Sequence, residues 1–310
     1  MKPLLFSFLI VSFVAQCNST EFSVREDYFI NDIDIDIYTR TWEPVDRKPI
    51  ANVVFVHGQA EHVYRYNHVF SEFAKAGLKV HGFDQVGCGR TGLKSNSLGG
   101  AMGMARVRID IDDAIERVYD PETPLFLMGH SFGGATIIDY LARGNKRDLL
   151  YGAVASAPDL ELSPESKPNL IVQAALRAVV AVTPMAKVPA DLDLSYLSRN
   201  ATEVEIYKND PLIFSKCAAV QVYDTVFGGE YILKGGYKNI NIPRLLIVHG
   251  SSDKITSPVV SNRLYRELQS QGVPKNLDFI LYPGAYHELH NDLNKREVIS
   301  NHIKWILSQL

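Results

Sequence analysis

Three polar residues far apart in the chain have the types and the order needed for nucleophilic catalysis. Ser131 stands at the centre of a Gly-His-Ser-Phe-Gly run at 129–133, and Asp253 and His287 follow later in the chain. A serine hydroxyl is a poor nucleophile at neutral pH unless a histidine takes its proton and a carboxylate orients that histidine. We therefore predict a catalytic triad of Ser131, Asp253 and His287.

The elements expected around Ser131 are a strand, a sharp turn and a helix. The apolar stretch 125–128 precedes the run, and the helical pattern 135–141 follows it. Glycines suit a strained turn because a β-carbon would crowd the neighbouring backbone. A bare Gly-x-Ser-x-Gly also arises by chance, but this context is that of the nucleophile elbow of an α/β-hydrolase.

The proposed acid and base also follow predicted strands. Asp253 comes after the apolar segment 244–248, and His287 comes after the segment 277–282. In an α/β-hydrolase the acid and the histidine lie just beyond later strands, in the order serine, acid, histidine. This agreement of order and placement makes the assignment more specific than any one residue.

Four other residues compete for these two roles. Asp278 falls inside a predicted strand, and Asp292 comes after the histidine, against the expected order. His302 falls in the C-terminal helix, and His290 lies one helical turn beyond His287. We therefore keep Asp253 and His287.

Acyl transfer also needs donors for the developing oxyanion, each worth about 3 kcal/mol. The backbone N–H after the nucleophile, that of Phe132, is the first expected donor. The second is expected in the loop after the strand 53–56, where Gln59 is best placed and Ala60 is the alternative.

Further strands and helices alternate along the chain, which predicts a mostly parallel central sheet with helices on both faces. The alternating segment 33–40 predicts a half-buried strand, and the other strands are expected at 53–56, 78–83, 125–128, 152–155, 244–248 and 277–282. Helices are expected at 66–76 and 109–118.

The pattern changes between residues 156 and 227, which we interpret as a cap inserted into a core of residues 20–155 and 228–310. Within this cap, residues 170–182 are apolar nearly all round, so the helix is either fully buried or packed over something apolar. It faces either an acyl chain or only its neighbours in the cap.

Composition limits the partners. The net charge of −3 gives no reason to expect nucleic acid. The aspartates of segment 33–40 lack the glycine turn of a calcium loop, so no metal is expected there. Cys88 is expected in a loop and Cys217 in a helix, with both as free thiols.

The N-terminus is expected to be a signal peptide over residues 1–19. Lys2 precedes an apolar run at 4–15 that is shorter than the ~20 residues of a spanning helix. We expect cleavage and entry to the secretory pathway, and the alternative is a membrane anchor formed by residues 4–15. Lipidation of Cys17 is disfavoured because Gln16 is large.

Several segments together resemble the monoacylglycerol lipases. They are the entry motif 57–62 with Arg65-Tyr66, the glycine-rich loop 84–89, the elbow 129–134, the cap segments 198–207 and 210–213, and the histidine loop 282–290. The resemblance covers roughly residues 36 to 310. Gln59 and Cys88 depart from it, because a small residue and a histidine are usual at those positions.

The resemblance implies hydrolysis of monoacylglycerol to fatty acid and glycerol through an acyl-enzyme on Ser131, with no cofactor or metal. It also implies transient contact of the cap with a membrane or micelle. Tyr196 is implied at the acyl tunnel and alcohol exit, and Glu61 and Arg65 are implied near the glycerol end.

The same triad also suits other activities, because fold does not fix substrate. The alternatives are a lysophospholipase or broad carboxylesterase, a peptidase or acyltransferase, and an inactive lipid-binding protein.

Overall fold

The computed structural model describes residues 21–310. The expected signal peptide at 1–19 therefore lies outside the described residues. Within the described part, no helix is both long and apolar enough to cross a membrane.

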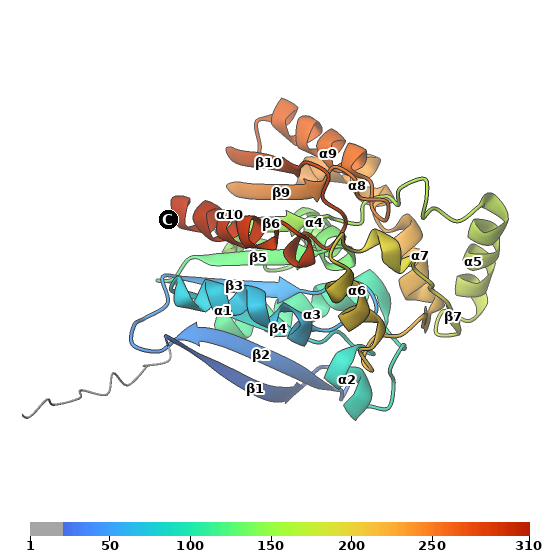
Figure 1. Ribbon diagram of the computed structural model, residues 1–310, viewed down its shortest axis with the longest axis horizontal. Helices are drawn as coiled ribbons and strands as arrows, with labels where there is room; N and C mark the ends of the chain where they lie inside the picture. The colour runs from blue at the N-terminus through green and yellow to red at the C-terminus, as the bar shows by residue number, and fades with distance from the viewer. Residues whose placement is uncertain (1–20) are drawn as a thin grey trace, which may run out of the picture.

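An eight-stranded sheet forms the centre of the molecule, in the order β1-β2-β4-β3-β5-β6-β9-β10 (Figure 1). The strands are β1 (Phe22–Ile30), β2 (Asp36–Pro44), β3 (Ala51–Val56), β4 (Leu78–Phe83), β5 (Leu125–His130), β6 (Gly152–Ser156), β9 (Arg244–Gly250) and β10 (Asn276–Tyr282). From β4 to β10 all neighbours are parallel, and β1 and β2 are antiparallel additions at one edge. The prediction of a mostly parallel sheet is confirmed.

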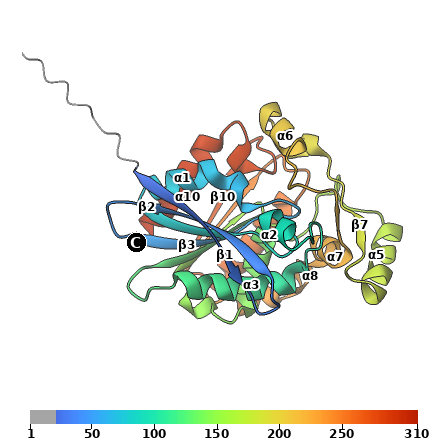
Figure 2. The ribbon, with the colours of Figure 1, turned by 90° about the horizontal axis from the view of Figure 1, so that it is seen from below.

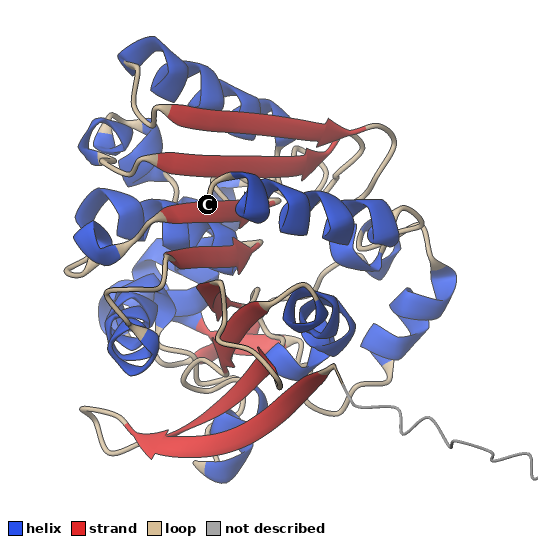
Figure 3. Cartoon of the chain, turned by 90° about the vertical axis from the view of Figure 1, so that its left-hand side faces the viewer, coloured by secondary structure: helices blue, strands red, loops and turns tan. Residues whose placement is uncertain are grey.

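Helices cover both faces of the twisted sheet (Figures 2 and 3). They are α1 (Asn67–Lys75), α2 (Gly89–Lys94), α3 (Gly103–Val118), α4 (Phe132–Arg143), α9 (Pro258–Gln271) and α10 (Lys295–Ser308). Val53 and Phe55 of β3 pack with α1 and α10, whereas Val54 and Val56 pack with α3, α4 and α9. An apolar run without polar alternation is therefore needed at β3, because both of its faces are buried.

Segment 33–40 is where the sequence prediction was wrong. Asp34 has a positive φ of 57° in a turn, and the strand begins only at Asp36. Ile37 and Tyr38 are successive residues on opposite faces, and both are fully buried. The strand is not half-exposed because α1 and α2 pack on β2.

Beyond the carboxyl ends of the parallel strands lies the cap (Figure 1). It contains α5 (Leu170–Val182), β7 (Lys187–Pro189), α6 (Ala201–Lys208), β8 (Lys216–Ala218) and α7 (Ala219–Phe227), and α8 (Glu230–Leu233) follows it. The short 3₁₀ turns of the chain are η1 (Val63–Tyr66), η2 (Arg147–Leu149), η3 (Leu194–Tyr196), η4 (Gly236–Asn239) and η5 (Leu289–Asn291). Strands β7 and β8 pair in an antiparallel ribbon, so Cys217 lies in a strand and not in a helix as expected.

Helix α5 is apolar nearly all round, yet only part of it is buried. Leu176 packs against Ala219 and Phe227 of α7. Ile171 and Val182 are both 81% exposed, on the outside of the cap. Of the two alternatives for this helix, full burial does not hold, because nothing in the described residues packs over its outer face.

Candidate active site

Ser131 lies on a strained turn between β5 and α4. Its backbone has φ 54° and ψ −120°, a conformation that few non-glycine residues adopt. The turn also brings backbones into close contact: a Cβ on Gly133 would lie 2.2 Å from the Val56 oxygen, and one on Gly129 would lie 2.5 Å from the Gly133 oxygen. Only glycine fits at these two positions, so the local sequence permits the turn that exposes the Ser131 hydroxyl.

The structure brings Ser131, His287 and Asp253 into one hydrogen-bonded chain. The distance from Ser131 Oγ to His287 Nε2 is 2.9 Å, and that from His287 Nδ1 to Asp253 Oδ2 is 2.8 Å. Ser131 follows β5, His287 follows β10 and Asp253 follows β9. Because these strands are parallel, their carboxyl ends lie at the same end of the sheet. The Nδ1–H can donate to the carboxylate while Nε2 accepts the serine proton, which is the arrangement that general-base catalysis needs.

Asp253 is held as a carboxylate. Its Oδ1 accepts the backbone N–H of Ile255 at 2.8 Å and that of Thr256 at 3.0 Å. Burial alone would raise the pKa of Asp253, but His287 and the bond from His249 hold it well below its usual range. Burial alone would likewise lower the pKa of His287, but the Asp253 carboxylate raises it above the ordinary value of 6.5.

The competing acids have structural partners elsewhere. Asp278 accepts the indole N–H of Trp305 at 2.7 Å, and Asp292 binds Arg199 at 3.0 Å. Neither acid bonds to a histidine in the part of the chain that the structure describes.

The competing histidines are buried away from the nucleophile. His290 stacks on Tyr66 with ring centroids 4.5 Å apart, and His302 is buried in α10. His130 lies beside His287, and burial lowers its pKa to about 3, so it stays neutral there. Among the histidines of residues 21–310, only His287 bonds to the Ser131 hydroxyl.

The two expected oxyanion donors lie in the elbow itself and in the turn after β3. Phe132 is the first residue of α4, where a backbone N–H has no acceptor within the helix. Gln59 lies in the turn after β3 and lines the same cavity as Ser131. Ala60, the alternative, lines it too and has a positive φ of 58°. The partial positive charge at the start of α4 also favours an anion here.

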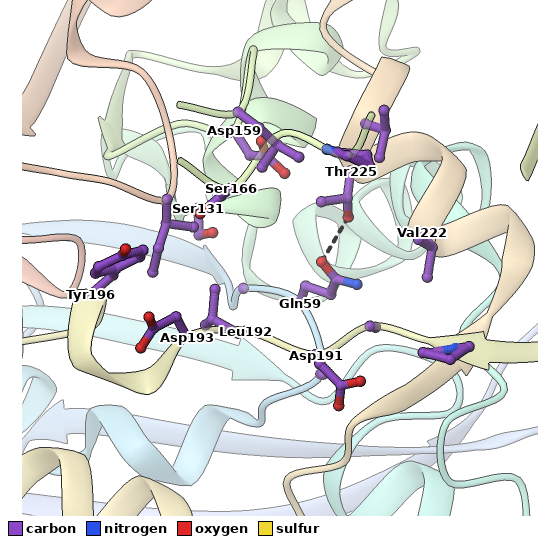
Figure 4. Close-up of a pocket in the computed structure, with 18 of the residues that line it drawn as sticks. Gln59, Ser131, Asp159, Ser166, Asp191, Leu192, Asp193, Tyr196, Val222 and Thr225 are labelled. Carbon is purple, nitrogen blue, oxygen red and sulfur yellow. Dashed lines mark hydrogen bonds between the residues drawn. The ribbon is translucent and has the colours of Figure 1, made fainter. Parts of the chain in front are cut away.

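The Gln59 side chain is engaged by the cap (Figure 4). Its Oε1 accepts the hydroxyl of Thr225 on α7 at 2.8 Å, and its Nε2 lies 3.7 Å from Cys217 Sγ on β8. Burial raises the pKa of Cys217 to about 11, so this sulfur is a neutral thiol. A residue larger than the usual small one is thus accommodated because the cap holds both ends of its amide.

Glu61 and Arg65 belong to a buried ionic group with Glu288. Arg65 contacts Glu61 and makes two bonds of 2.8 Å to Glu288. Glu61 Oε1 also accepts the N–H of Gly58 at 2.5 Å, in the oxyanion turn. Burial alone would lower the pKa of Arg65, but the two carboxylates raise it.

Of the implied substrate contacts, Glu61 and Tyr196 line the cavity, whereas Arg65 does not. Sequence reasoning missed Glu288, which also lines the cavity. Its position directly after His287 was the available signal.

A cavity of about 600 Å³ opens above the triad. Ser131 and His287 line it from the core, and apolar side chains of α5 and α7 line it from the cap: Val172, Leu176, Val179, Val222 and Val226. On α5 these residues recur at helical spacing, so one face of that helix borders the cavity. The size suits a drug-sized or lipid-sized ligand.

No group of three or more His, Cys, Asp or Glu side chains within residues 21–310 is arranged to hold a metal ion. The site instead contains a nucleophile, its base and an orienting acid, beside the two expected backbone donors. On this fold, that geometry defines a serine hydrolase.

The chain also matches a known protein family. Residues 47–294 match the Hydrolase_4 family model, described as serine aminopeptidase, S33. The chain belongs to this family.

Relatives and solved structures agree over most of the chain. A Monoacylglycerol lipase of Mycolicibacterium smegmatis is 30% identical over 87% of this chain and 92% of its own length. The crystal structure of a monoacylglycerol lipase of Paleococcus ferrophilus is 29% identical over 88% of this chain and 99% of that one, with a TM-score of 0.77.

Other relatives extend well beyond the matched region. A Schizosaccharomyces pombe relative is 35% identical over 82% of this chain, which spans 66% of that relative. The chain spans 28% of a Dictyostelium discoideum relative that is 31% identical.

Proposed function

We propose that this protein hydrolyses the carboxylic ester of monoacylglycerol to a fatty acid and glycerol. The observation that carries the proposal is the position of Ser131 on the floor of a cavity with apolar cap walls. A single acyl chain is complementary to such walls, and burying it contributes about 0.8 kcal/mol per CH₂ group. The names of the Mycolicibacterium and Paleococcus relatives support the same substrate.

The reaction proceeds through an acyl-enzyme. His287 Nε2 takes the Ser131 proton as Oγ attacks the ester carbonyl, and the N–H groups of Gln59 and Phe132 stabilise the oxyanion. His287 then gives the proton to the glycerol oxygen as the C–O bond breaks. A water molecule, activated by the same histidine, attacks the acyl-enzyme and releases the fatty acid with Ser131 restored.

A lysophospholipid with a cationic head group is the second candidate substrate. Three exposed carboxylates line the cavity, those of Glu165, Asp191 and Asp193. Within residues 21–310, no Lys or Arg lines this cavity. Such a rim attracts a quaternary ammonium and disfavours an anionic head group.

The outer face of α5 serves as the contact with a lipid surface. Leu170, Ile171 and Val182 are each at least 80% exposed beside the cavity wall. Exposed apolar side chains gathered at one place favour membrane or micelle contact.

Residues 1–19 direct the chain to the secretory pathway, and the N-terminal sequence of the secreted protein tests this.

A substrate panel with matched oleoyl chains tests the function. Purified residues 21–310 are given 1-oleoylglycerol, oleoyl lysophosphatidylcholine, oleoyl lysophosphatidate and an aminoacyl anilide, and kcat/KM is measured for each. Of the three esters, we expect 1-oleoylglycerol to be hydrolysed fastest and oleoyl lysophosphatidate slowest, and we expect no turnover of the anilide. Faster turnover of lysophosphatidylcholine selects the second candidate, and turnover of the anilide alone contradicts both.

A further inference from the structure

Asp159 is a buried carboxyl group beside the nucleophile that the triad does not use. It lies in the loop after β6, and its backbone N–H donates to the Ser131 carbonyl oxygen at 3.0 Å. Its side chain lines the same cavity as Ser131 and His287 (Figure 4), yet the residue is only 3% exposed. The carboxyl therefore borders the same cavity in which the scissile ester must lie.

This carboxyl lacks a partner within the part of the chain that the structure describes. Its Oδ1 is buried without a hydrogen bond. An unpaired buried polar group costs about 1–3 kcal/mol, so a molecule that supplies the missing partner gains that interaction. Glu61 and Glu288 line the same cavity but are already bonded to Arg65.

The protonation state favours a neutral ligand group. Burial raises the pKa of Asp159 to about 8, and the charges that face it are His287, which lowers the pKa, and Asp253, which raises it. At neutral pH the group is then mostly a carboxylic acid, with one O–H donor and acceptor capacity. An alcohol, which also donates and accepts, is its closest chemical match.

We propose that Asp159 binds a hydroxyl group of the substrate next to the scissile ester and thereby selects hydroxyl-bearing esters over plain alkyl esters. The proposal deepens the proposed function and rests on it for the reaction type. The hydroxyl belongs either to the glycerol part of a monoacylglycerol or to a hydroxylated acyl chain, and the experiment separates these two sources.

Three esters and four variants test the proposal. The substrates are 1-oleoylglycerol, methyl oleate and methyl 3-hydroxyoleate, and kcat/KM is compared for the wild type, Asp159→Leu, Asp159→Ala and Asp159→Asn. The control is Glu161→Gln, on the same loop but paired with Lys167 and not lining the cavity. Labelling of Ser131 by a fluorophosphonate checks that each variant keeps an intact triad.

We expect Asp159→Leu and Asp159→Ala to lose about 10-fold to 100-fold on a hydroxyl-bearing ester and little on methyl oleate. Asp159→Asn, which keeps a donor and an acceptor, restores much of the loss. A loss on 1-oleoylglycerol alone identifies the glycerol hydroxyl, and a loss on the hydroxyoleate alone identifies the acyl hydroxyl. Asp159→Ala adds no bulk, so it carries the test if the leucine variant does not fold.

Equal losses on all three esters, or none on any, overturn the proposal and leave Asp159 a structural group. The two proposals fail in distinguishable ways. If the wild type cleaves methyl oleate but not 1-oleoylglycerol, the proposed function is wrong, while the hydroxyoleate still tests Asp159.

Discussion

The core of this protein buries its apolar side chains, whereas the cap leaves part of its apolar surface exposed. In the core, side chains such as Val54 and Phe55 are fully buried between sheet and helices. In the cap, Leu170 and Ile171 of α5 are at least 80% exposed, while the opposite face of the same helix borders the cavity. The core therefore fixes the catalytic geometry, whereas we propose that the cap supplies the surfaces that contact lipid.

The largest effects are expected where the core holds the reacting atoms. Ser131→Ala and His287→Ala should each lower kcat by about 10⁴-fold or more, to a similar residual rate, because the triad acts as a unit. Thermal unfolding should stay near that of the wild type. Near-native turnover in either variant would break the assignment of chemistry to the core.

The next largest effect concerns the acid. Asp253→Asn should lower kcat by about 10⁴-fold at most, because the amide favours the wrong histidine tautomer.

The pH profile tests the same pair. His287 must be neutral to act as a base, and its raised pKa places the acid limb of the wild-type kcat/KM profile above pH 6.5. Removing the Asp253 charge should move this limb to lower pH. An unmoved limb contradicts the electrostatic pairing of these two residues.

A smaller effect is expected on the outside of the cap. The double change Leu170→Ser and Ile171→Ser should lower turnover of micellar 1-oleoylglycerol by about 10-fold, because two apolar side chains no longer bind lipid. Turnover of a soluble short-chain ester should be unchanged. The matched control is Val259→Ser, at a valine 76% exposed on α9 of the core. An equal loss in the control removes the contrast between the two regions.

The last expected effect concerns stability and leaves the chemical step aside. Asp159 has a folded pKa of about 8 against an ordinary 3.8, so the folded state holds one more proton between those values. Its contribution to stability is therefore complete below about pH 4 and is lost as pH rises through about 8. The Tm of Asp159→Asn relative to wild type should rise between pH 5 and about pH 8. A difference in Tm that stays constant with pH would contradict the raised pKa of the buried Asp159 carboxyl.

The sequence pattern predicted the features that depend on residues close together in the chain. The run 53–56 has apolar residues at every position because both faces of β3 are buried, and the glycines at 129 and 133 reflect backbone contacts within the elbow. The triad of Ser131, Asp253 and His287 could be predicted because each residue follows a predicted strand, in the order serine, acid, histidine.

Contacts between residues far apart in the chain could not be predicted from the sequence pattern. The alternation at 33–40 resembled a half-buried strand because sequence does not show that α1 and α2 cover β2. The pairing of Arg65 with Glu288 joins residues 223 positions apart. The isolation of Asp159 depends on what its surroundings lack, which no sequence pattern displays.

The most direct test of the central claim is reaction of the folded protein with a fluorophosphonate, followed by peptide mapping. The account predicts one adduct, on Ser131, whose formation is slowed by 1-oleoylglycerol and abolished in Ser131→Ala. Labelling at another residue, or none on folded protein at a pH above the His287 pKa, would contradict it.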